Sequence, residues 1–172
     1  YITQDKELKE TIEIIEYKAE TMKNLVTQFY EFSRLNAGDY KLKMDGVDIS
    51  RTLRESLAGN YQVLQQSDLN VVVDIPEHPI WVLGEAAVLE RIFLNLLQNA
   101  GRYADTCLNI VVREAAENVI ISFMNDTKVL SEEEVSHLFD RFYMQDHSRN
   151  QGGTGLGLTV TKSLAEEMGG TL

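Results

Sequence analysis

The sequence is poor in the residues that build covalent or metal-linked frameworks. It has only one cysteine, Cys107, and only two prolines in 172 residues. With a single cysteine, an intramolecular disulfide and a cysteine-based metal site are both excluded. Cys107 lies in an apolar stretch and is expected to be a small core residue, and so few cysteines fit a reducing, cytosolic compartment. No apolar run reaches the roughly 20 residues of a spanning helix, and no signal peptide opens the chain. We expect this piece to be soluble, whatever its parent carries upstream.

Basic residues are also in short supply. Lysine and arginine total 16 against 27 aspartates and glutamates, which gives a formal net charge of -11. Nonspecific binding to nucleic acids and anionic membrane surfaces depends on a basic field. The composition therefore predicts no nucleic-acid partner, and any anionic ligand has to be bound by a local site.

What the sequence does have is a long amphipathic helix in its first part. Apolar residues recur there at alternating steps of four and three, which places them on one seam; they are Leu8, Ile12, Ile15, Ala19, Met22, Val26 and Phe29. Leu25, Tyr30 and Phe32 widen the stripe, which favours a bundle of several helices over a two-stranded zipper. Gly38 supplies a helix stop. A helix folded back on its own domain remains the alternative.

The remainder of the chain alternates between helical and strand patterns. Amphipathic periodicity, and a capping box that begins at Ser131, predict helices at residues 49–66, 85–103, a short stretch from 131, and 156–168. Alternating or continuous apolar runs predict strands at residues 69–75, 80–83, 108–113 and 119–124. This order predicts the α+β class: a mixed α/β sandwich, with helices on one face of a mixed sheet, preceded by the long coiled-coil-type helix.

A cluster of glycines directly before the last predicted helix is a candidate phosphate site: Gly152, Gly153, Gly155 and Gly157. Glycines let a backbone approach phosphates closely, and the amides of a following helix stabilise the charge. A dinucleotide fold needs a strand before the glycines, where this chain has a polar loop. A P-loop needs Lys then Ser or Thr after the last glycine, where this chain has Leu158 and Thr159. Both interpretations fail, and a purely structural turn remains open.

A second candidate segment lies on the helix predicted from residue 85. Asn95, Asn99 and Arg102 are spaced by four and three residues, so they project from one side of the helix. A neutral amide oxygen ligates Mg²⁺ without cancelling its charge, so that the ion can still bridge phosphate oxygens. The alternative is that this polar stripe is only the solvent face of an amphipathic helix.

Four segments in this order resemble the nucleotide-binding boxes of bacterial sensor histidine kinases: LNLLQNAGRYA, a strand that ends in Asn125 and Asp126, LFDRFY, and GGTGLGL. That family shares its ATPase fold with gyrase-type topoisomerases, heat-shock-90 chaperones and mismatch-repair ATPases. VTQFYEFSRLNAG resembles the end of the second helix of the family's dimerisation hairpin. The resemblance implies that residues 1–38 are this helix and that residues 39–172 are the ATP-binding catalytic domain, without the last strands of the family.

The resemblance also implies an activity and partners. Kinases of this family are transferases of two-component signal transduction, which bind ATP and Mg²⁺ and donate the γ-phosphoryl group to a histidine. The group is then relayed to an aspartate on the receiver domain of a response regulator. The resemblance further implies a homodimer formed through the hairpin helices, and a cytoplasmic catalytic part whose parent is membrane-anchored.

Carried over by position, the resemblance assigns roles to individual residues. On the helix they are Asn99 as the Mg²⁺ ligand, Asn95 on the phosphate side, Arg102 on the phosphates and Tyr103 as a wall against the nucleotide. The glycine loop is expected to contact the nucleotide through Gly153, Thr154, Gly155, Leu156 and Gly157. Phe139 and Phe142 would anchor the start of a lid or be ordinary core aromatics, and Arg149 would reach the terminal phosphate or stay solvated.

The chain departs from the family where adenine is recognised. Family members usually carry there an aspartate that accepts a hydrogen bond from the adenine amino group, followed shortly by glycines. Alignment back from LFDRFY places Asn125 at this position. Asp126 would take its place if the register slipped by one, but neighbours on a strand face opposite sides, which favours Asn125. An asparagine oxygen accepts the same proton more weakly than a carboxylate does. A module of the same fold with impaired nucleotide binding and a regulatory or dimerisation role is therefore the alternative function.

The phosphate-accepting histidine of the family is absent. The three histidines, His78, His137 and His147, all lie outside the long helix and are expected to be surface or packing residues. No catalytic residue is therefore predicted within this chain. A chaperone or topoisomerase relative that hydrolyses ATP would need a catalytic acid such as Glu85 or Glu90, and the kinase-like LFDRFY segment ranks this hypothesis last.

Overall fold

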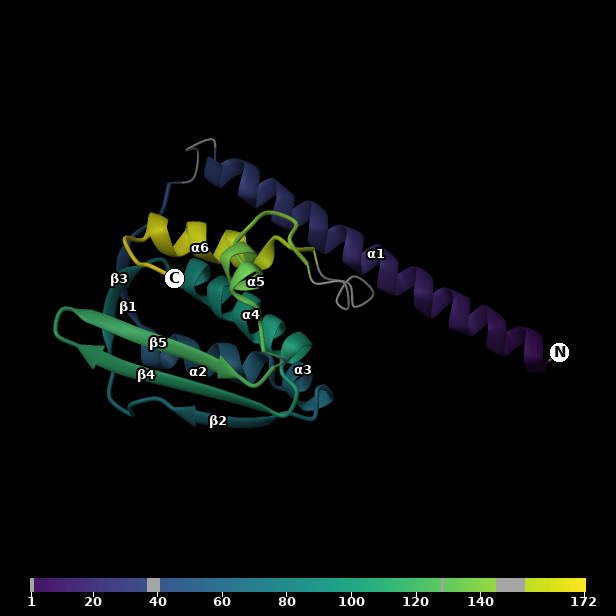
Figure 1. Cartoon of the computed structure of the whole chain (residues 1–172), viewed down its shortest axis with the longest axis horizontal. Coiled ribbons are helices and arrows are strands. Elements are labelled where there is room, and N and C mark those ends of the chain that lie inside the picture. Colours follow the sequence, from purple (N-terminus) through teal and green to yellow (C-terminus); the bar gives the residue numbers. More distant parts are fainter. Residues whose placement is uncertain (1, 37–40, 128, 145–153) are drawn as a thin grey trace.

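The computed structural model describes residues 2–36, 41–127, 129–144 and 154–172. The elements are, in order, α1 (Ile2–Asn36), β1 (Asp45–Asp48), α2 (Ile49–Gly59), α3 (Tyr61–Gln66), β2 (Asn70–Asp74), β3 (Trp81–Gly84), α4 (Ala86–Tyr103), β4 (Cys107–Ala115), β5 (Asn118–Asn125), α5 (Glu132–His137) and α6 (Gly157–Glu167). Figure 1 shows α1 extending away from a body in which helices lie against strands.

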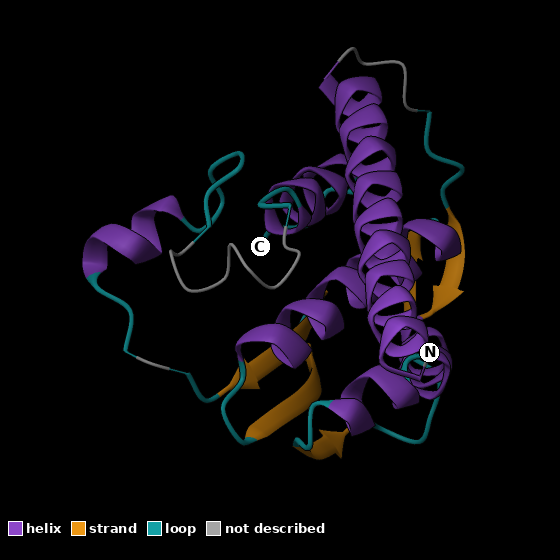
Figure 2. Cartoon of the chain, turned by 90° about the vertical axis from the view of Figure 1, so that its right-hand side faces the viewer, coloured by secondary structure: helices purple, strands orange, loops and turns teal. Residues whose placement is uncertain are grey.

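The main sheet has the strand order β2-β4-β5, with β2 parallel and β5 antiparallel to β4. Along β4, Leu108, Ile110 and Val112 are fully buried, whereas Ile120 and Met124 of β5, which lie on the other face of the sheet, are exposed. This period of two means that one face packs on the core and the other meets solvent. The predicted class, a mixed sheet with helices on one face, is confirmed (Figure 2).

A second, smaller sheet pairs β1 with β3 in antiparallel register. The sequence pattern does not predict β1, because only Val47 of its four residues is buried. The pair is fixed at one end by Asp48, whose carboxylate accepts hydrogen bonds from the backbone N–H groups of Arg51 and Ile80, each at 3.3 Å. Asp48 is thereby also the N-cap of α2, a role that its short acidic side chain suits.

The prediction of one continuous helix over residues 49–66 is wrong, because α2 and α3 meet at Asn60. The side-chain amide of Asn60 donates a hydrogen bond to the carbonyl oxygen of Ser56 at 2.8 Å, and its backbone has left the helical region. Asparagine offers the backbone such competing bonds, and Gly59 before it is a poor helix former. The two residues together end α2.

The core is centred on α4, which contacts α2, α6 and β5. Its buried residues recur at helical spacing: Val88, Leu89, Ile92, Phe93, Asn95, Leu97 and Ala100. Phe93 stacks on Phe123 of β5 with ring centroids 6.2 Å apart, and Val160 and Leu164 of α6 belong to the same core. Because one side of α4 is committed to the core, its other side is available to line a site.

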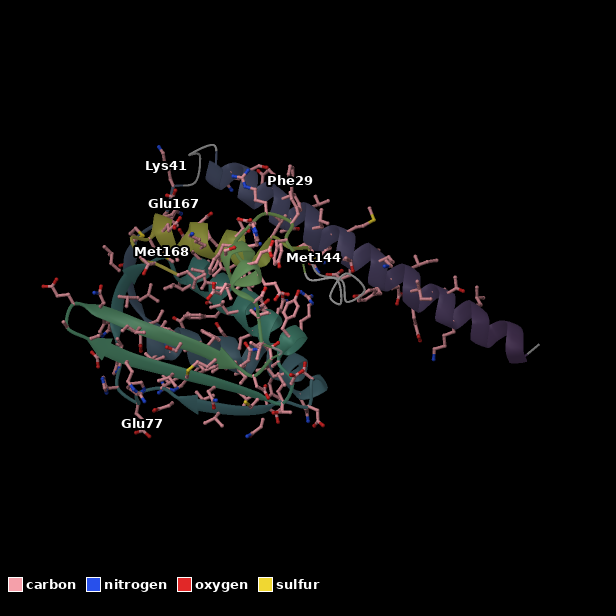
Figure 3. The ribbon with its side chains drawn as sticks, in the orientation of Figure 1. Phe29, Lys41, Glu77, Met144, Glu167 and Met168 are labelled. Atoms are coloured by element: carbon pink, nitrogen blue, oxygen red, sulfur yellow. The ribbon has the colours of Figure 1, made fainter. Side chains whose placement is uncertain are left out.

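The long helix α1 is in contact with α6, and much of it stands clear of the rest of the described chain (Figure 3). The seam residues Ile15, Met22 and Val26 are 61%, 68% and 62% exposed. The predicted apolar stripe therefore lies on a helix as expected, and in a single copy of the chain these residues face solvent. None of the helices in the described ranges is long and apolar enough to cross a bilayer.

Candidate functional site

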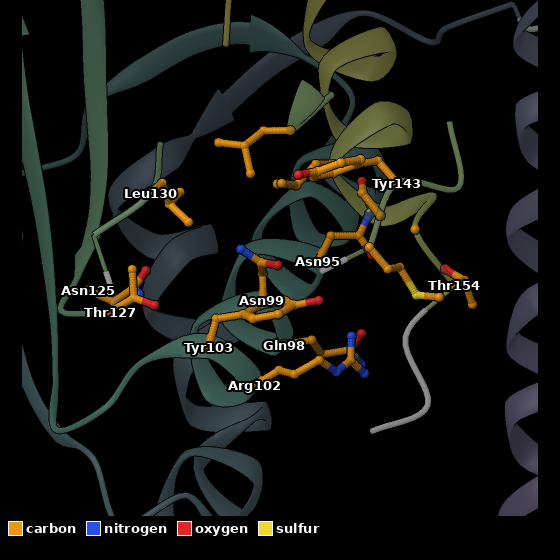
Figure 4. Close-up of a pocket in the computed structure, with 15 residues that line it drawn as sticks. Asn95, Gln98, Asn99, Arg102, Tyr103, Asn125, Thr127, Leu130, Tyr143 and Thr154 are labelled. Carbon is orange, nitrogen blue, oxygen red and sulfur yellow. Dashed lines mark hydrogen bonds between the residues drawn. The ribbon is translucent and has the colours of Figure 1, made fainter. Parts of the chain in front are cut away.

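A cavity of about 260 Å³ opens beside the polar side of α4 (Figure 4). The residues of α4 that line it are Asn95, Gln98, Asn99, Arg102 and Tyr103. They share one side of the helix because steps of three and four residues return to the same face, and Phe93 and Leu97 on the other side are buried. The three residues that the sequence spacing selects, Asn95, Asn99 and Arg102, all line this one cavity.

Later segments of the chain form the facing walls. Residues beyond β5 contribute Thr127 and Leu130, and Asn125 lies at the end of that strand. The walls near α5 and α6 are made by Leu138, Tyr143, Met144, Thr154, Gly155, Gly157 and Leu158. The asparagine helix and the glycine segment, 50 or more residues apart in the sequence, therefore close around the same space.

Not every residue that the sequence singled out lies at this cavity. Leu156 is fully buried in the core, and Phe139 and Phe142 are not among the residues that line the cavity. Phe142 is 56% exposed, while the ammonium group of Lys162 lies 5.3 Å from the Phe139 ring centroid. Gly153, together with Arg149 and His147, lies outside the described residues.

Asn95 ties α4 to α6. Its side-chain amide donates hydrogen bonds to the hydroxyl of Thr161 at 3.2 Å and to the carbonyl oxygen of Gly157 at 3.4 Å. Asn95 is 8% exposed and Thr161 is completely buried, and a buried polar group without a partner is costly. The pair therefore fixes the start of α6 against the helix that carries Asn99.

The backbone also closes on itself between the end of the α5 segment and the glycine segment. The N–H of Phe142 donates to the carbonyl oxygen of Gly155 at 2.9 Å, and both residues have positive φ angles, 62° and 67°. A Cβ atom at Gly155 would lie 2.6 Å from the Phe142 carbonyl carbon. Only glycine fits this position, because it tolerates both the left-handed backbone and the close approach.

The cavity carries positive charge in a chain with a net charge of -11. Arg102 is the one arginine or lysine among its described lining residues, and none of those residues is an aspartate or glutamate. Within the described ranges, the guanidinium of Arg102 forms no ion pair and the side chain of Asn99 forms no hydrogen bond. Arg102 and Asn99 are therefore available to an anionic ligand and to its counter-ion.

Asn125, the last residue of β5, and Asp126, which follows it, face different surroundings, as successive residues of an extended chain should. Asn125 lines the cavity. The carboxylate of Asp126 instead accepts hydrogen bonds from the hydroxyl and N–H of Thr106 and from the N–H of Cys107, at 2.6 to 3.1 Å. These bonds, the one from the Thr106 hydroxyl first, hold the pKa of Asp126 far below its ordinary value. Asp126 is committed to the sheet and does not line the cavity.

The side chains that line the cavity suit a metal ion that is held mainly by a bound polyphosphate and less by the protein. No cluster of three or more His, Cys, Asp or Glu side chains in the described ranges offers a preformed metal site. Asn99 instead presents one neutral amide to the cavity, and Mg²⁺ is commonly bound by few protein ligands together with substrate phosphates and water. The residues present therefore fit Mg²⁺ bound jointly with a polyphosphate.

Comparison with known families agrees with this geometry. The family described as "Histidine kinase-, DNA gyrase B-, and HSP90-like ATPase" matches residues 84–172, a stretch that includes every described residue of the cavity. The chain belongs to this ATPase family.

Curated relatives of the chain are sensor kinases. The chain is 27% identical over 172 residues to the sensor histidine kinase YcbM of Bacillus subtilis (strain 168), an alignment that covers 98% of this chain and 55% of the relative. It is 30% identical to the swarming motility regulation sensor protein RssA of Serratia marcescens, covering 99% of this chain and 37% of that protein. The prediction of a sensor histidine kinase ATP-binding domain is thereby confirmed, although the chain spans only part of each relative.

Solved structures agree on the fold of the ATPase domain. The Acinetobacter baumannii histidine kinase AdeS superposes with a TM-score of 0.71 at 21% identity, over 86% of this chain and 68% of that one. Full-length ShkA in complex with AMPPNP gives a TM-score of 0.70 at 21% identity, over 85% of this chain and 31% of that one. At this identity the likeness supports the fold alone.

The sequence does not predict a site role for seven of the residues that line the cavity: Gln98, Thr127, Leu130, Leu138, Tyr143, Met144 and Leu158. Gln98 could have been found, because it lies one turn before Arg102 on the same side of α4. Leu138 and Tyr143 lie within LFDRFY, where only the two phenylalanines were singled out. Leu130 and Met144 carry no local signal, since only the folded chain brings them to α4.

Proposed function

We propose that the cavity binds ATP with Mg²⁺, and that the chain is part of the kinase core of a sensor histidine kinase. The γ-phosphoryl group would go to a histidine outside this chain, and from there to an aspartate on a response-regulator receiver domain. One observation carries the proposal. Asn99, Arg102 and the glycine segment meet in a cavity whose described lining has no acidic side chain, within a chain of this ATPase family.

The two ends of the cavity differ in a way that orients a nucleotide. Arg102 and Thr154 lie toward one end, and Asn125 and Thr127 toward the other, with Asn99 between them (Figure 4). Phosphates are stabilised by the guanidinium group, which supplies directed hydrogen bonds as well as charge. The uncharged end, which also has Leu130, suits a heterocyclic base, because small-molecule sites combine apolar walls with a few placed polar groups.

Asn99 would hold the magnesium ion, which neutralises phosphate charge when it is bound. The rest is done by the chain's own residues. Arg102 would bind the phosphates, and Tyr103 would lie against the nucleotide. The backbone from Gly155 to Gly157 would approach the phosphates at the start of α6, where free N–H groups and the helix dipole favour negative charge. These residues would contribute to phosphoryl transfer mainly by positioning the nucleotide and by stabilising its charge.

The uncovered seam of α1 supports a homodimer. Ile12, Ile15 and Met22 are 47%, 61% and 68% exposed, and a row of this kind at a heptad spacing is stable in water only when another helix covers it. In the proposed kinase, the second copy supplies its own hairpin helices to a four-helix bundle. Residues 1–38 would then be the second hairpin helix and residues 39–172 the catalytic domain, on the cytoplasmic side of a membrane-anchored parent.

Calorimetric titration of Mg²⁺–ATP into the chain tests the proposed site. We expect saturable binding that weakens at least about tenfold in Asn99→Ala, equal to about 1.4 kcal/mol. Asn109→Ala, on the solvent face of β4, is the matched control and should bind as the unchanged chain does. In parallel, the amide NMR signals of Asn99, Gly155 and Gly157 should shift on titration. Signals that stay unmoved at millimolar nucleotide would exclude this site.

A second candidate function is a regulatory or dimerisation module of the same fold with impaired nucleotide binding. It is favoured by Asn125, because a neutral acceptor stands where the resemblance leads us to expect a carboxylate. The same titration separates the two functions. The module predicts no saturable binding at millimolar Mg²⁺–ATP and no difference between the unchanged chain and Asn99→Ala.

A further inference from the structure

The end of the cavity lined by Asn125, Thr127 and Leu130 is called here the base end, and neither of its two described polar side chains has a fixed hydrogen-bond sense. Asn125 carries an amide, with an oxygen that accepts and a nitrogen that donates, and Thr127 carries a hydroxyl that does both. Both side chains line the cavity, away from Arg102. The nearest carboxylate in the sequence, that of Asp126, is held by Thr106 and Cys107. Among the described side chains at this end, a ligand therefore meets no obligatory acceptor.

Purines differ mainly in the sense of the groups at this edge. Adenine presents an amino donor at position 6 beside the acceptor N1, whereas hypoxanthine and guanine present an oxygen at position 6 beside a donor N1–H. An asparagine amide can satisfy either pair by turning over, because it carries an acceptor oxygen beside a donor nitrogen. A carboxylate is an acceptor alone, so it takes the amino group at position 6 of adenine but repels the oxygen that hypoxanthine and guanine carry there.

We propose that this site accepts 6-oxopurine nucleoside triphosphates, such as ITP and GTP, as well as ATP, because Asn125 is the residue that reads position 6 of the base. The proposal rests on the proposed function and narrows it, since it concerns which purine triphosphate the same cavity takes. Asn125 is thus a specificity-determining residue whose amide, in place of a carboxylate, leaves the site tolerant.

Turning the amide over breaks one long hydrogen bond in this structure. The amide nitrogen of Asn125 donates to the carbonyl oxygen of Asp126 at 3.3 Å, which is longer than the usual range of protein N–H···O bonds. It is the one hydrogen bond of the Asn125 side chain within the described residues. Loss of so weak a bond amounts to about tenfold in affinity at most, equal to about 1.4 kcal/mol. We therefore expect the dissociation constants for ITP and ATP to differ by about tenfold or less.

The test is a calorimetric titration of the chain with ATP, ITP and GTP, each with Mg²⁺. ITP differs from ATP at this edge alone, while GTP adds a 2-amino group, so that ITP isolates the contact with Asn125. The variant Asn125→Asp introduces an obligatory acceptor at this position. Asn118→Asp is the control, because it adds the same charge to the exposed other end of β5. Thermal unfolding establishes that each variant is folded.

The expected result has two parts. The unchanged chain binds ITP within about tenfold of ATP, and Asn125→Asp raises the ratio of the ITP to the ATP dissociation constant at least about tenfold, while Asn118→Asp leaves it unchanged. An ITP dissociation constant more than about tenfold above that of ATP in the unchanged chain overturns the inference and leaves the ATP site standing. A ratio that Asn125→Asp does not alter overturns the role of Asn125. If no nucleotide binds the unchanged chain, the proposed function itself fails.

Discussion

Replacement of Gly155 by alanine tests whether the close contact beside the cavity is as rigid as its geometry indicates. The added Cβ would lie 2.6 and 2.7 Å from the carbonyl carbon and Cα of Phe142, and 2.9 Å from the carbonyl oxygen of Tyr143. These neighbours are backbone atoms, which cannot move aside as a side chain can. The hydrogen bond from Phe142 to Gly155 has to break, and one of the two segments has to shift.

The cost follows from two separate effects. A residue with a Cβ at the φ of +67° that Gly155 adopts loses about 1–2 kcal/mol relative to the right-handed region. Overpacking against fixed atoms costs about 1–3 kcal/mol, so the free energy of unfolding should fall by about 2–5 kcal/mol in all. For a chain of 172 residues, each 1 kcal/mol lowers Tm by about 2–4 °C, so Tm should fall by at least about 4 °C.

Gly157→Ala is the matched control, two residues further on. A Cβ there meets no atom within 4 Å, and its φ is not positive. Gly157 is the first residue of α6, so alanine should leave the unfolding free energy unchanged or raise it by up to about 1 kcal/mol through helix propensity. Calorimetric or circular-dichroism melting measures both variants. Equal Tm values for Gly155→Ala and Gly157→Ala would refute the argument from close contact.

Substitutions at three further positions each test a single feature of the structure. The folded-state pKa of Asp126 lies below its ordinary value of 3.8, so its carboxylate stabilises the fold fully at pH 7 and less as the pH falls below 3.8. The difference in Tm between the unchanged chain and Asp126→Asn should therefore shrink in melting experiments at pH 7, 4 and 3. Ala116 has a φ of 52° in the β4–β5 turn, so Ala116→Gly should raise the unfolding free energy in urea by about 0.5–1 kcal/mol, because relief of left-handed strain exceeds the added chain entropy. Thr161→Val removes the hydroxyl that accepts from Asn95 and should cost about 1–3 kcal/mol in urea; Thr161→Ser keeps the hydroxyl and should lose less.

Elements whose pattern is local could be predicted from the sequence. The helix expected at residues 85–103 is observed as Ala86–Tyr103, because its apolar period is determined by its own residues. The capping box at Ser131 is present as expected, with both of its hydrogen bonds. β1 could not be found in this way, because DGVD forms a strand only when β3 supplies the partner. The break at Asn60 had a local signal in Gly59 and Asn60, which the apolar periodicity of residues 49–66 outweighed.

In the candidate site, too, local patterns predict some residues, whereas others are placed only by the tertiary fold. Its α4 side follows from the spacing of Asn95, Asn99 and Arg102, since residues on one helix share a face whatever the tertiary fold. In the glycine segment, spacing does not determine which residues meet the cavity: Leu156 lies in the core, whereas Leu158 lines the wall. Gly155 has a positive φ, which interrupts any regular period in this segment, so no sequence period encodes the direction of these side chains.

The distribution of charge leads to a last expectation, on the salt dependence of binding. A net charge of -11 repels a nucleotide at long range, and salt screens this repulsion beyond a Debye length of about 8 Å at physiological ionic strength. Among the described lining residues, Arg102 is the one cationic side chain that attracts the nucleotide. Because the two effects oppose each other, the dissociation constant for Mg²⁺–ATP should change less than about threefold between 50 and 200 mM salt, against about 10³–10⁵ for a protein that neutralises six to ten nucleic-acid phosphates. Calorimetry at the two salt concentrations measures this. A fall in affinity of more than about tenfold would mean that several cationic groups, and not Arg102 alone, hold the phosphates.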